Sequence, residues 1–108
     1  MDILSSADME FVEHILMPYF MVKKLHIDYS PSTKKWPDIW IEPTRPIPRI
    51  MVTETWKRKN ARQRRVELVH EFLHLNGLEH GKMSNFVYHT VPEKDTYSEY
   101  VYEAIMKQ

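Results

Sequence analysis

The chain has no cysteine, no net charge and no long apolar run. Without cysteine no disulfide can form, and a bound metal ion must be held by nitrogen and oxygen ligands. The 15 basic residues balance the 15 acidic ones, so the molecule as a whole lacks the positive field that draws proteins to nucleic acid. No apolar run approaches the ~20 residues that cross a bilayer, and residues 1–10 lack the basic start of a secretory signal. We therefore expect a soluble, cytoplasmic protein.

What is present predicts one small globular domain. The chain has 108 residues, of which 43% are hydrophobic and 28% are charged, which is enough for one core and too little for two. Apolar residues recur at helical spacing from Phe11 to Tyr19. Ser5 or Ser6 can cap this helix, and Pro18 should end or kink it.

Three strands should follow this helix. Apolar and polar residues alternate at 25–29, and two isoleucines flank a tryptophan at 39–41, which is the period of a half-buried strand. Residues 50–56 are rich in β-branched side chains and predict a third strand. The prolines within 42–48 exclude regular pairing in the segment between the last two strands.

A long helix is predicted next, beginning near Ala61. Asn60 and Gln63 can form its N-terminal cap. Gly77 is a natural end for it, because glycine adopts the left-handed conformation at little steric cost. The last segment, 96–108, suits either a strand or a helix. The order of the elements, with a helix, three strands, a long helix and a tail, predicts an α+β domain.

The long helix carries the sequence HEFLHLNGLEH, which starts at His70. His70 and His74 lie one turn apart on one face, a spacing at which two imidazoles can reach one metal ion. Glu71 points about 100° away from His70 around the helix, where a carboxylate can take a proton from water without becoming a ligand. A catalytic zinc ion takes three protein ligands, and Gly77 lets the chain turn back so that His80 could supply the third.

The alternative is an ordinary buried helix that carries these polar residues by chance. Burying two imidazoles and a carboxylate without partners would be unfavourable. Once the two helix histidines and the glutamate are present, the later glycine and histidine fall at their positions by chance roughly one time in a thousand, from the composition alone. The sequence therefore predicts a zinc site.

The motif resembles the zinc-binding helix of the zincin metallopeptidases. Its long form, His-Glu-x-x-His-x-x-Gly-x-x-His, is similar to that of the metzincins, in which both helix histidines and the histidine after the glycine bind zinc. The short, cysteine-free chain, with one helix and three strands ahead of the motif, more closely resembles the minigluzincins, which are minimal soluble zincins. This resemblance implies a minimal zincin catalytic domain at 1–95, kinship with the catalytic domains of membrane-embedded peptidases, and a latent form blocked by the tail at 96–108.

The implied activity is the zinc-dependent hydrolysis of peptide bonds. Zinc held by His70, His74 and His80 would polarise the scissile carbonyl and activate water. Glu71 would act as the base and then protonate the leaving amine. His89 stays open as an alternative third ligand, because the third ligand of a gluzincin comes from a later helix.

Two further features are expected around such a site. The peptide or protein substrate should bind as an added strand along a sheet edge, and residues 50–56 are the candidate for that edge. Tyr88 or His89 lies within sequence reach of the oxyanion. The other two histidines, His14 and His26, are expected at the surface.

Two other functions fit parts of the sequence. The protein could be a non-catalytic module that keeps zinc for structure, but such a site has no use for Glu71 directly after its first histidine. The basic segment KRKNARQRR at 57–65 could bind nucleic acid, although a basic run in a chain without net charge is more often a solvated surface. No membrane partner is expected.

Overall fold

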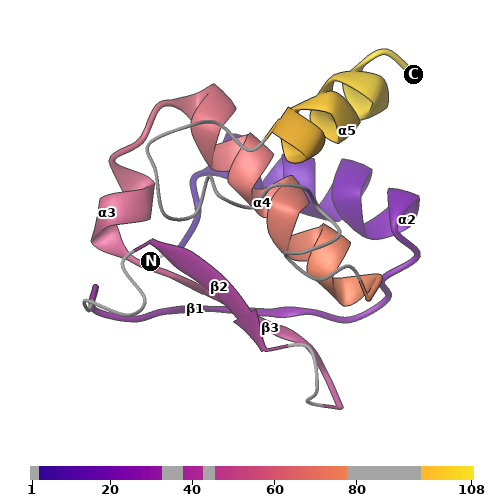
Figure 1. Cartoon of the computed structure of the whole chain (residues 1–108). Coiled ribbons are helices and arrows are strands. Elements are labelled where there is room, and N and C mark those ends of the chain that lie inside the picture. Colours follow the sequence, from indigo (N-terminus) through magenta and orange to yellow (C-terminus); the bar gives the residue numbers. More distant parts are fainter. Residues whose placement is uncertain (1–2, 33–37, 43–45, 78–95) are drawn as a thin grey trace.

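The computed structural model describes residues 3–32, 38–42, 46–77 and 96–108 (Figure 1). These residues form a three-stranded sheet and several helices, which confirms the predicted α+β class. In Figure 1 the long helices lie together on one side of the sheet. Within the part of the chain that is described, every helix is too short or too polar to cross a bilayer.

The N-terminal helix is continuous but changes its winding. It consists of α1 (Ser6–Glu10), the π-helical segment η1 (Phe11–Leu16) and α2 (Met17–Tyr19). The side-chain oxygen of Ser5 accepts a hydrogen bond from the backbone N–H of Asp8 at 3.2 Å, which confirms the predicted cap. Pro18 lies in the last segment, and the helix ends one residue later, close to the predicted end.

The sheet forms one side of the core. Its strands are β1 (His26–Tyr29), β2 (Ile39–Glu42) and β3 (Arg49–Val52). Their order is β1-β3-β2, with β1 parallel and β2 antiparallel to β3. Ile27 and Ile41 lie on either side of Ile50 in register. Because Ile50 is fully buried, this apolar row forms part of the face that packs under the helices.

The prediction of an edge strand at 50–56 is wrong in two respects. β3 is the central strand of the described sheet, and it ends at Val52. The side-chain oxygen of Thr53 accepts a hydrogen bond from the N–H of Trp56 at 3.3 Å and caps the short helix α3 (Glu54–Lys57). The β-branched residues at 50–56, which suggest one strand, therefore belong partly to β3 and partly to α3 and its cap.

Two helices complete the structure, α4 (Ala61–Leu75) and α5 (Thr96–Met106), and they pack against each other. The side-chain oxygen of Asn60 accepts a hydrogen bond from the N–H of Gln63 at 2.8 Å. Gly77 follows the helix with a φ of 86°. Both predicted ends of the long helix are therefore confirmed. Of the two alternatives for the tail, the helix is correct.

The core lies between the sheet and these helices. Leu68 and Phe72 of α4 are fully buried, and the ring of Phe72 lies 5.6 Å from that of Phe20, centre to centre. From α5, Tyr102 and Ile105 are buried in the same cluster. Since burying a large apolar side chain contributes about 1.5–3 kcal/mol, the tail is an integral part of the core.

Candidate metal centre

The imidazoles of His70 and His74 converge beside α4. Their Nε2 atoms lie 3.1 Å apart, and their rings meet edge-on with centroids 4.7 Å apart. Two nitrogen ligands at the usual distance from a tetrahedral zinc ion are separated by about 3.3 Å. The observed contact has the length of a hydrogen bond between the two rings, and the separation is also close to that of two ligands of one zinc ion. The structure thus brings together the two residues that the helical spacing places on one face.

The other ring nitrogen of His70 faces α5. Its Nδ1 lies 3.3 Å from Oγ of Ser98, and Ser98 is fully buried. A proton on Nδ1 can be donated to this oxygen, which leaves the lone pair of Nε2 directed toward His74. Metal-binding histidines are usually held by a partner on the second ring nitrogen. Ser98 lies where such a partner is expected.

The sequence alone does not single out Ser98. It lies 28 residues beyond His70, in a segment whose pattern also suits a strand. Only the packing of α5 against α4 brings the two side chains together. One indication is present in the helical spacing, because Ser98 shares its face with the buried Tyr102 and Ile105. A small polar residue on an otherwise apolar face indicates a polar partner.

Glu71 follows His70 on α4 and is buried, with 5% of its surface exposed. Because successive helical residues point about 100° apart, its side chain leaves the helix in a different direction from that of His70. A carboxylate that follows a metal-binding histidine on a helix can accept a proton from water without binding the metal itself. The position of Glu71 therefore suits a base better than a ligand.

The predicted third ligand, His80, and its alternative, His89, lie outside the described residues, as does Tyr88. Among the residues that are described, no three or more histidine, aspartate or glutamate side chains are grouped so as to hold a metal ion. The structure thus assembles two of the three predicted ligands. The third stays a prediction.

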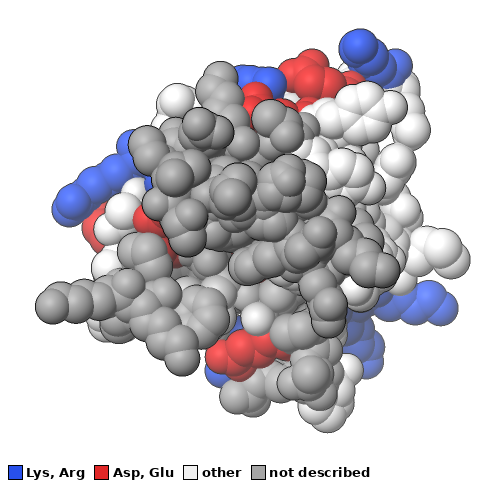
Figure 2. All heavy atoms as spheres, viewed as in Figure 1, with Lys and Arg blue, Asp and Glu red and all other residues white. Residues whose placement is uncertain are grey.

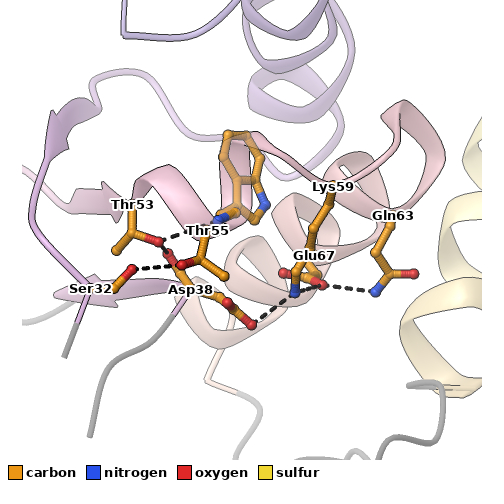
Figure 3. Close-up of polar contacts among 8 residues, drawn as sticks. Ser32, Asp38, Thr53, Thr55, Lys59, Gln63 and Glu67 are labelled. Atoms are coloured by element: carbon orange, nitrogen blue, oxygen red, sulfur yellow. Dashed lines mark hydrogen bonds and ion pairs between the residues drawn. The ribbon is translucent and has the colours of Figure 1, made fainter. Parts of the chain in front are cut away.

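A polar network fixes the N-terminal half of α4 (Figure 3). The ammonium group of Lys59 lies 2.8 Å from a carboxylate oxygen of Asp38 and 2.8 Å from one of Glu67. The side-chain nitrogen of Gln63 donates to the same oxygen of Glu67 at 2.8 Å. Burial alone would lower the pKa of Lys59, but its hydrogen bonds to Asp38 and Glu67 outweigh burial and raise that pKa. The network holds the residue before β2 against the helix that carries the histidines.

Much of the basic segment 57–65 is engaged in ion pairs within the molecule. Arg62 lies 3.2 Å from Glu99 of α5, and Arg64 lies 2.8 Å from the buried Asp8 of α1. These carboxylates compensate basic residues that would otherwise oppose the dipole at the start of α4. Among the described residues that are visible in Figure 2, basic and acidic side chains lie near one another at several places on the surface.

The two histidines that precede the motif, His14 and His26, are exposed, as expected. Comparison of the chain with protein-family models, with curated proteins and with solved structures gives no match. The function must therefore be inferred from the side chains of the site.

Proposed function

We propose that the protein is a zinc-dependent peptidase of minimal zincin fold, with its active site on α4. The observation that carries this proposal is the pair of Nε2 atoms of His70 and His74, 3.1 Å apart, on the same helix as the buried Glu71. His70, His74 and His80 would hold the metal. Zinc, when bound there, polarises a carbonyl and activates water for attack.

Glu71 transfers the proton in this mechanism. Its carboxylate accepts a proton from the attacking water and delivers it to the nitrogen of the leaving amine as the peptide bond breaks. Glu71 is thereby returned to its ionised form for the next cycle. The hydroxyl of Ser98 lies 3.3 Å from Nδ1 of His70 and holds that imidazole in one orientation. The chain thus supplies the base, the ligands and an orienting group.

We propose β2, instead of residues 50–56, as the edge strand to which the substrate binds. It lies at one edge of the described sheet and contacts α4, whereas β3 is paired on both sides. An extended peptide added to β2 would gain main-chain hydrogen bonds while lying beside the helix that carries the histidines. The substrate would therefore be an unfolded segment of a peptide or protein.

The C-terminal segment 96–108 enters this proposal as a restraint on activity. The resemblance to minigluzincins implies a latent form, and α5 packs against the helix that carries the predicted ligands. A segment attached to the same chain acts at a high effective concentration and therefore competes well with free substrate for a shared surface.

A non-catalytic zinc module is the second candidate function. The histidine pair supports it equally well, but a structural site has no need of the buried carboxylate of Glu71. Nucleic-acid binding has less support, because Arg62 and Arg64 of the basic segment are already paired with carboxylates.

The variant Glu71→Gln separates the peptidase from the zinc module. Glutamine keeps the shape of the side chain and removes the proton acceptor, so the zinc content should be that of the wild type. Cleavage of unstructured casein should fall by at least about a hundredfold. The matched control is Glu67→Gln on the same helix, which should remain active because its amide oxygen can still accept a hydrogen bond from Lys59. Loss of zinc, or retained cleavage, in Glu71→Gln would contradict the assigned role.

A further inference from the structure

A groove lies at the edge of the sheet opposite β2. It has a volume of about 570 Å³ and runs between the N-terminal helix and β1, within the range of about 300–1,000 Å³ found for ligand sites. Met9, Val12 and Met17 of the helix form one wall, and Leu25 and Ile27 form the other. The groove is therefore an apolar channel beside an edge strand.

The backbone of β1 offers hydrogen-bonding groups along this channel. β1 is an edge strand of the described sheet, and the N–H of His26 donates to the carbonyl of Pro48 at 2.9 Å, on the side of β3. Because backbone groups alternate in direction along a strand, the N–H and C=O of Ile27 point away from β3. Five consecutive residues, 23–27, line the groove, so it runs beside the segment that leads into β1 and the first two residues of the strand.

The rim of the groove is basic. Lys23 and Lys24 line it and are exposed. Among the residues that the structure describes, the ion pairs involve neither lysine. Glu13 is the one acidic residue among those that line the groove. A ligand with acidic groups next to apolar ones would complement this surface.

We infer that the groove binds an extended segment of a partner protein, added to β1 as a further strand. Apolar side chains at alternate positions of the segment enter the channel, its main chain pairs with Ile27, and acidic residues at one end meet Lys23 and Lys24. The edge of β1 favours a peptide over a lipid, because an acyl chain has no backbone groups to pair with it. This site does not depend on zinc.

The test uses the full chain with Glu71→Gln, so that no peptide is cleaved. A short synthetic peptide with leucine and valine at alternate positions and aspartate at both ends is titrated into the ¹⁵N-labelled protein. Amide resonances of residues 25–29 should shift saturably, and the amide of Ile27 should become protected from hydrogen exchange. The same peptide with its central amides N-methylated loses donors for the ladder and should bind at least about tenfold more weakly.

Charge variants provide the second arm of the test. The double variant Lys23→Glu and Lys24→Glu should weaken binding about tenfold, because it removes two exposed ion pairs. The matched control, Arg58→Glu with Lys107→Glu, makes the same change of charge at exposed residues outside the groove and should bind the peptide as the parent does.

Four results would overturn the inference. They are equal binding of the N-methylated peptide, complete displacement of the peptide by decanoate, and resonance shifts confined to residues around His70. The fourth is protection of Ile27 that rises with protein concentration when no peptide is present, since the occupant would then be a second copy of the chain.

Discussion

Replacing Ser98 with alanine removes the hydroxyl that lies 3.3 Å from Nδ1 of His70. Loss of such a partner typically weakens metal binding 10- to 100-fold. The distance here is longer than the usual 2.9–3.0 Å, so we expect the lower end of that range, about tenfold weaker zinc binding. Ser98 is fully buried, but alanine differs from it by one oxygen atom. The lost hydrogen bond should cost about 1 kcal/mol, and the variant should stay folded.

The assay is a competition titration of zinc against a chromophoric chelator, with thermal unfolding of the metal-free protein measured alongside. The matched control is Ile105→Val on the same helix, which removes one methylene group from a residue that is 5% exposed and should cost about 0.5–1.5 kcal/mol. Both variants should melt earlier than the wild type, and only Ser98→Ala should bind zinc more weakly. Equal losses of affinity in both would show that packing is responsible, and unchanged affinity in Ser98→Ala would refute the orienting role.

Three further predictions concern the third ligand, the tail and the polar network. Zinc affinity should fall strongly in His80→Ala and little in His89→Ala; the reverse result in the same titration would move the third ligand to the later histidine. Truncation after Asp95 removes core side chains of α5 worth about 1.5–3 kcal/mol each and should lower the free energy of unfolding in urea. The truncation also removes Ser98, which contacts His70, so cleavage is compared at saturating zinc. Under the latency proposal the portion that stays folded should then cleave casein faster than the full chain, and no gain in cleavage would refute latency. Because the pKa of Lys59 is raised above 10.5 by folding, the stability that it contributes is complete below that pH and is lost as the pH rises through the raised pKa. The difference in unfolding free energy between the wild type and Lys59→Met should therefore shrink above pH 10.5, and a constant difference would contradict this role.

The helix that carries the site could be predicted because its ends and its face depend on local rules. Asn60 and Gln63 form the expected cap, Gly77 adopts the left-handed conformation at the other end, and the four-residue spacing brings His70 and His74 together. These features follow from helical geometry within a few residues of each other.

The order of the strands could not be predicted in this way. All three strands are short, and alternation along a strand does not say which strands lie beside it. The β-branched residues of 50–56 in fact mark the central position, since Ile50 and Val52 of β3 are fully buried, whereas β1 and β2 contain no fully buried residue. Thr53 adds a second difficulty, because a residue that favours strands also caps helices well.

The contact between Ser98 and His70 could not be predicted from a sequence pattern. It joins two helices across 28 residues of chain, and only the packing of the whole domain determines which face of α5 meets α4. Such contacts depend on tertiary structure, which is why the orienting residue of the site appears only with the fold.

The central claim is that α4 carries a zinc site, and metal analysis tests it most directly. The purified wild-type protein should contain close to one zinc ion per chain after dialysis. His70→Ala and His74→Ala should lose most of the zinc, because each variant lacks one ligand. Glu71→Gln should keep the zinc, because Glu71 is the base and not a ligand. A wild type as free of zinc as the two histidine variants, or variants as fully loaded as the wild type, would contradict the claim.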